Sequence, residues 1–286
     1  MYHTPVLLTE TLECLAIEPA DRVIDATVGD GGHSQAMLER LGPVGRLLGL
    51  DASPISLERA RARLGDDKRL TLVHANFTEL AQVADDQQVG HVNAILFDLG
   101  IASWQIDEPG LGLSFQRDEP LDMRLDPRRG RTAADIVNRA TPGELMTIFE
   151  ELGGLQRSRS LVERMVAARH QGPIRTTQQL VAVIGSAQPR VLAPLFQALR
   201  MAVNDELGAL ASALDQAIEL IVAGGRLAVI SFHSGEDRVV KHRFQAAVRM
   251  HDWRSLIAHP LVPTVEEQQT NRRSRSAKLR AIQRVG

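Results

Sequence analysis

The sequence contains a single cysteine, Cys14, among its 286 residues. One thiol excludes an intrachain disulfide and any metal cluster built from several cysteines. The chain also lacks an apolar run of membrane-spanning length, and Thr9, Glu10 and Glu13 interrupt the stretch where a secretory signal would be apolar. A marked net charge is absent too, because 33 basic and 35 acidic residues leave a formal charge of -2. We therefore expect a cytoplasmic protein without membrane contact, whose affinity for nucleic acid must come from local patches.

Strand and helix signals alternate regularly through the first hundred residues. Short apolar runs bounded by turn formers predict strands at 22–26, 46–51, 70–74 and 91–99. Segments with apolar residues at helical spacing lie between the first three runs, at 34–41 and 54–64. A βαβαβ order of this kind predicts an α/β fold with a parallel, doubly wound sheet.

The alternation stops after Asp98. Residues 101–135 are rich in turn formers and have no sustained strand period, which is typical of a long functional loop. Apolar residues at helical spacing follow from 133 to 202, after which a helix at about 204–222 and a buried strand at 226–231 resume the sheet. We therefore predict one domain interrupted by an inserted loop and helical domain, with the three parts at 1–108, 109–200 and 201–286.

A glycine-rich turn follows the first predicted strand, in VIDATVGDGGHS (23–34). Gly29 and Gly31 fit the first two glycines of the dinucleotide-binding fingerprint, but Ser34 replaces the third. Asp25, directly before the turn, would repel a pyrophosphate, yet it suits a cofactor with a cationic amino group. S-adenosylmethionine has such a group and no phosphate.

Three further residues stand where the next predicted strands end. Asp51 can accept hydrogen bonds from both ribose hydroxyls of an adenosine, a role that dehydrogenases and methyltransferases share; the alternative is a helix-capping aspartate. Phe77 can pack on adenine or belong to the core. Asp98 faces the crevice where open α/β sheets bind ligands. Together with Asp25, these positions favour S-adenosylmethionine over NAD.

Seven segments resemble motifs of one known family. They span nearly the whole chain and occur in the same order as in that family. They are HTPVLLTE (3–10), DATVGDGGHS (25–34), FDLGIAS (97–103), LSFQRDEPLDMR (113–124), FQALRMAVNDEL (196–207), SFHSGEDRVVK (231–241) and NRRSRSAKLR (271–280). On these segments the chain is similar to the bacterial small-subunit rRNA cytosine-N4 methyltransferases, called RsmH and formerly MraW. Many methyltransferases share the glycine turn, whereas several of the other segments are specific to this family.

The resemblance implies a Rossmann-like class I methyltransferase fold with an inserted all-helical domain, and S-adenosylmethionine as methyl donor. It implies as substrate the exocyclic N4 of a cytidine in the decoding region of 16S rRNA, within the small ribosomal subunit. The family's cofactor contacts carry over to Gly31, Gly32, His33, Asp51, Phe77, Asp98 and Gln105. Two departures are Gly235, where the family usually has leucine, and the absence of the threonine and arginine expected before Phe196.

The chemistry of an amine methyltransferase suggests further candidates. The cytosine amine is a poor nucleophile, so acceptors aimed at its protons would favour the reaction, and Asp98, the Leu99 carbonyl and Ser103 are suitably placed. His233 follows a predicted strand at the same crevice edge and is a further catalytic candidate. The base must leave its stack, and Trp104 can stack on it or pack in the core. The chain has DLGI where many amine methyltransferases have a D/S-P-P-Y turn.

Substrate binding is assigned to basic residues. The segment 271–284 contains no acidic residue, and Arg272, Arg273 and Arg275 within it precede a predicted final strand. Arg124 belongs to a second candidate surface for the RNA. A metal site near His233 is disfavoured, so we expect none. The alternatives are a DNA cytosine or other amine methyltransferase, an NAD-linked oxidoreductase and a non-catalytic RNA-binding assembly factor. Whether two copies form a homodimer is open.

Overall fold

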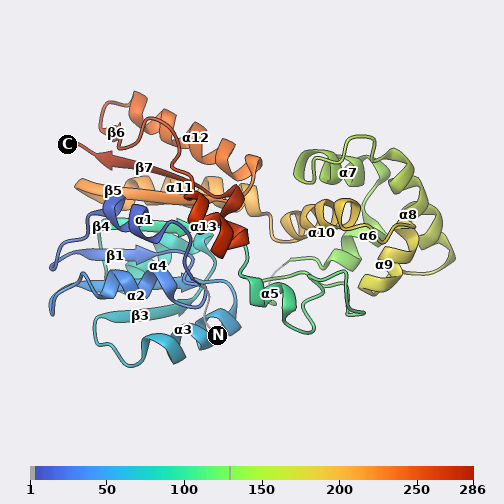
Figure 1. The fold of residues 1–286 in the computed structure, drawn as a ribbon, viewed down its shortest axis with the longest axis horizontal. Helices are drawn as coiled ribbons and strands as arrows, with labels where there is room; N and C mark the ends of the chain where they lie inside the picture. Colours follow the sequence, from blue (N-terminus) through green and yellow to red (C-terminus); the bar gives the residue numbers. More distant parts are fainter. Residues whose placement is uncertain (1–3, 129) are drawn as a thin grey trace. The chain divides into compact units, whose positions relative to one another are not determined.

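The computed structural model describes residues 4–128 and 130–286, with the side chains of Ser103 and Arg273 outside the description. The chain forms two compact units, one comprising the chain up to Gly100 and from Leu207 onward, the other Ile101–Glu206. Figure 1 traces both along the sequence. Among the described residues, no helix is long and apolar enough to cross a bilayer. The domain boundaries expected at 108 and 200 stay predictions, because compactness alone does not establish a domain.

The first unit is built on a seven-stranded sheet with the order β3-β2-β1-β4-β5-β7-β6. Its strands are β1 (Arg22–Asp25), β2 (Arg46–Asp51), β3 (Leu70–His74), β4 (Val92–Asp98), β5 (Ile221–Ser231), β6 (Trp253–Ser255) and β7 (Lys278–Arg284). Strands β1 to β5 are parallel, whereas β7 is antiparallel to β5 and β6. The order reverses between β1 and β4, which creates the crevice where such sheets bind ligands. The fold is Rossmann-like class I with a helical insertion, as expected.

Helices cover both faces of this sheet (Figure 1). Ile24 lies on the face that packs against α4 (Leu80–Asp86), α11 (Glu206–Leu220) and α12 (Ser234–Arg249). Its neighbour Val23 lies on the face that packs against α1 (Leu8–Leu15) and α2 (Gly32–Leu38). Alternation along a buried strand produces these two apolar layers. The helical segments of this unit are α1 (Leu8–Leu15), α2 (Gly32–Leu38), α3 (Pro54–Leu64), η1 (Phe77–Glu79), α4 (Leu80–Asp86), α11 (Glu206–Leu220), α12 (Ser234–Arg249), α13 (Val265–Thr270) and η3 (Arg272–Ser276).

The second unit is helical and has its own core. Leu145, Phe149, Leu195 and Leu199 are buried at its centre. Its helical segments are α5 (Ser103–Asp107), α6 (Ala133–Arg139), α7 (Pro142–Thr147), η2 (Ile148–Leu152), α8 (Arg159–Gln171), α9 (Thr177–Ile184) and α10 (Pro189–Val203). Threonine capping boxes start α6, α7 and α9 and satisfy backbone N–H groups at these ends.

The structure differs from the sequence expectations in several places. The expected loop at 101–135 contains α5, and none of α1, α4, α12, α13 and β6 was predicted from the sequence. The helix expected to reach 222 ends at Leu220, because β5 already begins at Ile221 and extends through Gly224. Gly224 adopts a φ of 82°, which a glycine permits without strain. These differences leave the expected sheet order of the first hundred residues unchanged.

Candidate functional site

The first unit gathers most of the expected cofactor residues at one edge of its sheet. Phe77 follows β3, Asp51 ends β2, Asp25 ends β1 and Asp98 ends β4. These strands are neighbours in the order β3-β2-β1-β4 and are parallel, so their carboxyl ends meet at the same edge. The sequence prediction that these residues share one crevice is therefore consistent with the geometry, while their individual roles stay predictions.

Asp51 ties the glycine turn to the end of β2. Its Oδ2 accepts from the Gly29 N–H at 2.8 Å, and its Oδ1 accepts from the Ser53 N–H at 2.8 Å. Burial raises the pKa of Asp51 to about 6, although these hydrogen bonds oppose the shift. Ser53 caps α3 by accepting from the Ser56 N–H, so Asp51 is not the helix cap. A carboxylate has about four acceptor positions, which leaves Asp51 capacity for two hydroxyl donors.

Asp25 lies beneath the glycine turn and is 1% exposed. Its Oδ2 accepts from the Ser34 hydroxyl at 2.6 Å, and its Oδ1 accepts from the Thr27 N–H at 3.2 Å. Burial raises its pKa, and the hydrogen bonds from Ser34 and Thr27 only partly counter this. Ser34 therefore stands in place of the third fingerprint glycine for a reason: its hydroxyl satisfies a buried carboxyl group.

His33 connects this edge of the sheet to the residues before α1. Its Nδ1 lies 3.2 Å from Asp98 Oδ2, and its Nε2 lies 3.2 Å from the Val6 carbonyl oxygen. An ionised Asp98 and a backbone carbonyl can only accept, so this geometry favours the form of His33 that is protonated on both ring nitrogens. Burial lowers the pKa of His33, but the hydrogen bond to Asp98 and the nearby carboxyl groups outweigh burial and raise it overall.

Asp98 is fixed by two contacts, and one of its carboxylate oxygens has no hydrogen-bond partner among the described residues. Its backbone N–H donates to Thr27 Oγ1 at 2.6 Å, and His33 holds its Oδ2. Its Oδ1 is buried and has no hydrogen-bond partner among the described residues. An acceptor left buried without a donor costs about 1–3 kcal/mol, so this oxygen suits a ligand that brings its own N–H or O–H.

Phe77 and Gly32 each make a close packing contact near this edge of the sheet. The partly exposed Phe77 ring packs edge to face on the buried Phe97, with centroids 6.0 Å apart, so it has both a core contact and an open side. A Cβ on Gly32 would lie 2.5 Å from Pro5 Cγ. Glycine is therefore required at 32 because the chain before α1 passes directly against the turn.

His233 builds the start of α12. Its Nδ1 accepts from the Glu236 N–H at 3.3 Å, and Glu236 Oε2 accepts from the Phe232 and His233 N–H groups at 2.8 and 3.2 Å. His233 Nε2 also lies 3.0 Å from Glu236 Oε1. Sequence analysis missed this capping box because histidine replaces the usual serine or threonine, although the spacing of Glu236 was a usable signal. The catalytic role of His233 stays a prediction.

Asp237 is neutralised within the protein. Its carboxylate binds Lys278 Nζ at 3.0 Å and Arg280 Nε at 2.7 Å, both from β7. Burial raises the pKa of Asp237, but the hydrogen bonds and charges of these two cations outweigh burial and lower it. This carboxylate is thus paired with two cations, whereas the carboxyl groups that end β1 and β2 accept hydrogen bonds from backbone N–H groups and the Ser34 hydroxyl.

Three predicted residues belong to the second unit and are described within it. Gln105 is buried on α5, and its side-chain oxygen accepts from the Ala102 N–H at 2.7 Å. Arg124 is bound to Asp122, with its Nε 2.7 Å from Oδ1. Trp104 is partly buried on the same helix as Gln105. Their roles, and that of Ser103, whose side chain lies outside the described residues, stay predictions.

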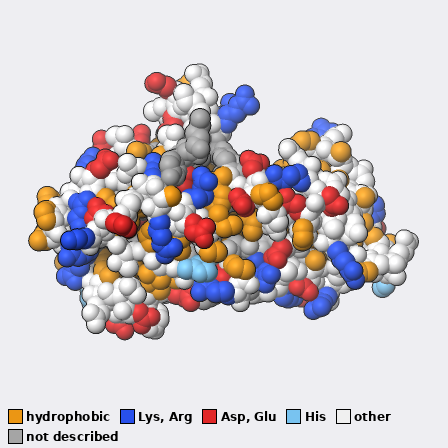
Figure 2. All heavy atoms as spheres, turned by 90° about the horizontal axis from the view of Figure 1, so that it is seen from below, with side chains coloured by type: hydrophobic (Ala, Val, Ile, Leu, Met, Phe, Trp, Pro, Cys, Tyr) orange, Lys and Arg blue, Asp and Glu red, His pale blue; other side chains and the backbone are white. Residues whose placement is uncertain are grey.

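The basic segment before β7 forms η3. Arg272 and Arg275 are exposed there, while Ser274 between them is buried and its hydroxyl donates to the Asn271 carbonyl at 2.9 Å. The Arg273 side chain lies outside the described residues. On the face shown in Figure 2, basic and acidic side chains are interspersed, in keeping with the small net charge. Attraction to a nucleic acid must therefore be local.

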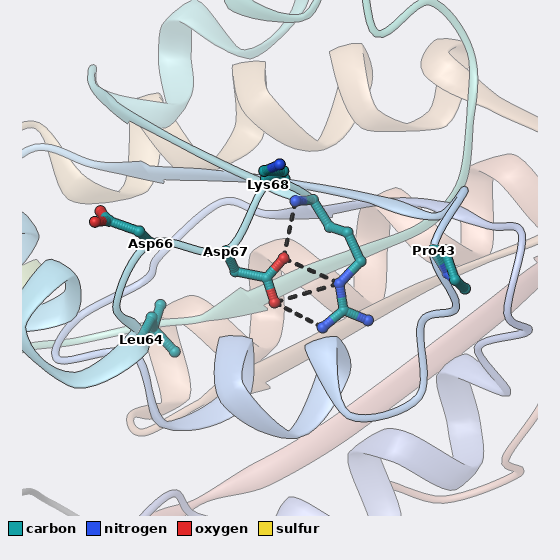
Figure 3. Close-up of a pocket in the computed structure, with 6 residues that line it drawn as sticks. Pro43, Leu64, Asp66, Asp67 and Lys68 are labelled. Atoms are coloured by element: carbon teal, nitrogen blue, oxygen red, sulfur yellow. Dashed lines mark hydrogen bonds and ion pairs between the residues drawn. The ribbon is translucent and has the colours of Figure 1, made fainter.

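A separate surface hollow is lined by Pro43, Leu64 and residues 66–69. Figure 3 shows the Asp67 carboxylate bound to the Arg69 guanidinium across it, with 2.6 Å between Oδ2 and Nη2. Residues 66–69 precede β3, so the hollow lies at the amino end of that strand. It is at the opposite edge of the sheet from the residues described above and is not part of their site.

Comparisons with known proteins were made for the whole chain. Residues 1–285 match the MraW methylase family. The ribosomal RNA small subunit methyltransferase H of Thermomicrobium roseum is 44% identical over 305 residues, covering 99% of this chain and 94% of the relative. The protein of that name from Heliobacterium modesticaldum is 39% identical, covering 99% of both chains. A solved rRNA methylase from Streptococcus thermophilus matches with a TM-score of 0.47 and 12% identity, covering 98% of this chain and 94% of that one.

Proposed function

The chain belongs to the MraW methylase family, and from that premise we propose that it transfers a methyl group from S-adenosylmethionine to the exocyclic N4 of a cytidine in the decoding region of 16S rRNA. Its relatives are named as methyltransferases of small-subunit ribosomal RNA, and the class I fold suits this chemistry. Membership of this family confirms the resemblance and the cofactor expected from the sequence. The choice of base and atom is the finer part of the proposal.

The observation that carries the proposal is the set of carboxyl groups at the ends of β1, β2 and β4. Asp25 places a buried carboxyl group next to the glycine turn, which suits the cofactor's amino group, and Asp51 has acceptor capacity for two ribose hydroxyls. Asp98 presents a buried oxygen without a donor. A cation with two hydroxyls and no phosphate fits this set, whereas a pyrophosphate would meet the charge of Asp25.

The mechanism assigns Asp98 two tasks. When bound, S-adenosylmethionine supplies an electrophilic methyl group on a sulfonium. Asp98 Oδ1 accepts an N–H of the cytosine amine, which draws the nitrogen lone pair out of conjugation and stabilises the positive charge that develops on it. His33 fixes Oδ2 and Thr27 fixes the backbone of Asp98, so the acceptor is aligned before the base arrives.

Recognition of the RNA is assigned to the exposed Arg272 and Arg275, to Arg273 and to the partly exposed Arg124. Arg272 and Arg275 can contact phosphates, as can Arg273 of the same segment, and Arg124 provides a second path. Trp104 stacks on the base once it is unpaired. The partner is thus the small ribosomal subunit or its RNA, which places the enzyme in the cytoplasm. Self-association as a homodimer stays a prediction.

The decisive experiment locates the methyl group. Purified protein is incubated with methyl-labelled S-adenosylmethionine and undermethylated small subunits, and the RNA is digested to nucleosides for mass spectrometry. We expect one labelled N4-methylcytidine per subunit, mapped by nuclease protection to the decoding region, and far slower labelling with Asp98→Asn protein. Label on C5 of cytidine, on another base or on DNA offered in competition would contradict the proposal.

A further inference from the structure

Residues Thr4–Leu7, here called the N-terminal strap, lie against the cofactor turn. Pro5 is so close to Gly32 that a Cβ there would be 2.5 Å from its ring. The Val6 carbonyl faces His33 Nε2 at 3.2 Å. The strap therefore supplies the acceptor that fixes one side of the histidine whose other side holds Asp98.

The strap is itself held by the C-terminal part of the chain. The Leu7 N–H donates to Glu267 Oε1 of α13 at 2.9 Å, across 260 residues of sequence. Asn271 Nδ2 donates to the Thr4 carbonyl at 3.3 Å. Leu7 is buried in the left-handed region, with φ 52° and ψ 37°, which a leucine rarely adopts. Such a conformation persists only where the surroundings enforce it, and the Glu267 carboxylate does so at the Leu7 N–H.

These contacts form a continuous path to the reacting group. Glu267 holds Leu7, the adjacent Val6 carbonyl holds His33, and His33 holds Asp98. We propose that Glu267 and Asn271 are positioning residues, which keep the strap in the place where the Val6 carbonyl orients His33 and through it Asp98. This inference rests on the proposed function in one respect, namely that Asp98 contacts the cofactor and accepts a hydrogen bond from the cytosine amine.

The test compares variants of α13. Glu267→Ala removes the acceptor for the Leu7 N–H, whereas Glu267→Gln keeps an oxygen there. The adjacent Glu266 is exposed on the same helix, and no described residue of the strap is bonded to it, so Glu266→Ala is the matched control for charge. Calorimetry without RNA should show S-adenosylmethionine affinity about tenfold weaker in Glu267→Ala, and near wild type in Glu267→Gln and Glu266→Ala.

A second readout follows the histidine itself. Ring nitrogen NMR, assigned with a His33→Gln variant, should show both His33 nitrogens protonated in wild type and a loss of the Nε2 hydrogen bond in Glu267→Ala. Asp98, Asp25 and the Val6 carbonyl are the groups that face the ring, and the variant leaves the two carboxylates in place. Should Glu267→Ala unfold, Asn271→Asp removes the donor to Thr4 and should weaken cofactor binding about twofold to threefold.

The outcomes separate the two proposals. Equal cofactor affinity in Glu267→Ala and Glu266→Ala, an unchanged His33 ring, or a failure of Glu267→Gln to restore affinity would overturn the positioning role. None of these measurements requires methylation of cytidine. A wild-type protein that binds S-adenosylmethionine but modifies another base would refute the proposed substrate and leave this inference standing.

Discussion

Carboxyl groups line two regions of the first unit, and the two regions neutralise them differently. At the junction of α12 and β7, Asp237 binds Lys278 and Arg280, which lower its pKa. At the ends of β1 and β2, Asp25 and Asp51 bind only backbone N–H groups and a hydroxyl, and burial raises their pKa. The protein pairs Asp237 with two cations, whereas no ion pair among the described residues involves Asp25 or Asp51, and at Asp25 the charge of His33 opposes the effect of burial on the pKa without overcoming it.

The presence or absence of a paired cation distinguishes structural carboxyl groups from those of a binding site. Burying a carboxyl group without a cation costs free energy, and such groups are typical of sites where a bound ligand compensates for that cost. The paired Asp237 needs no ligand to explain it. Asp237 thus differs from Asp25 and Asp51 in its bonding partners and in the direction of its pKa shift, although all three are aspartates of the first unit. The following predictions exploit that difference, beginning with the largest effect.

Asp98→Asn should lower the rate of methyl transfer about 10²- to 10³-fold, because the amide keeps the shape but loses the charge that stabilises the developing ammonium. Cofactor affinity should change far less. Single-turnover methylation at saturating S-adenosylmethionine separates the two effects. Asp237→Asn is the matched control and should transfer methyl groups at nearly the wild-type rate. A rate for Asp98→Asn within a few-fold of wild type would make Asp98 a cofactor contact or a structural residue only.

Asp51→Ala should weaken cofactor binding by about 1.5–3 kcal/mol, since hydrogen bonds to a charged acceptor are removed. The glycine turn also loses the bond from the Gly29 N–H. Calorimetry with S-adenosylmethionine measures the change. Asp67→Ala, in the hollow at the other edge of the sheet, is the control and should bind as wild type. Unchanged affinity in Asp51→Ala would remove that residue from the site.

Cofactor affinity should also depend on pH. Asp51 has a pKa of about 6 in the folded protein against 3.8 ordinarily, so the folded state holds the proton more tightly. Stability from this group is therefore present below about pH 4 and lost as pH rises through about 6. Ribose hydroxyls donate best to the ionised form, so affinity should rise about tenfold from pH 5 to pH 7. Burial lowers the pKa of His33, but its hydrogen bond to Asp98 and the nearby carboxyl groups raise it overall. A pH dependence retained in Asp51→Asn would assign it to another group.

The stability of the protein without cofactor should respond in opposite directions at Asp25 and Asp237. Asp237→Asn loses charge-assisted hydrogen bonds to Lys278 and Arg280, and should cost about 1 kcal/mol because both cations retain access to solvent. Asp25→Asn replaces a buried carboxyl group, whose pKa burial raises, with a neutral amide and should leave the free energy of unfolding unchanged or raised. Urea unfolding measures both. A large loss in Asp25→Asn would show that Asp25 is mainly structural.

Much of this edge of the sheet could be predicted because its signals are local. Asp51 and Asp98 end apolar runs, and parallel strands place such ends together. The exposure of Arg272 and Arg275 likewise agrees with the sequence interpretation, since they precede a strand with one wet face.

Other features depend on distant partners and could not be read locally. The strap's bond between Leu7 and Glu267 joins residues 260 positions apart, and no spacing rule connects them. The contact of His33 Nε2 with the Val6 carbonyl oxygen depends on the folded chain, which alone brings the two residues together. The start of β5 was misplaced because Ile221 continues the apolar spacing of α11, and pairing with β4 decides the boundary.

The smallest expected effect concerns the basic segment, whose arginines are exposed where Asp98 and Asp51 are recessed. Changing Arg272, Arg273 and Arg275 to alanine should weaken RNA binding and flatten its salt dependence by up to about 0.7 slope unit for each single-strand phosphate that is no longer bound. Cofactor affinity should not move, since the described side chains of this segment make no hydrogen bond to the cofactor residues. Arg40→Ala with Arg61→Ala, both exposed on the same unit, controls for charge alone. Filter binding at several salt concentrations gives the slopes. If the triple variant keeps the wild-type slope, the segment is a solvated surface, and the phosphate-binding residues must be sought at Arg124 and its neighbours.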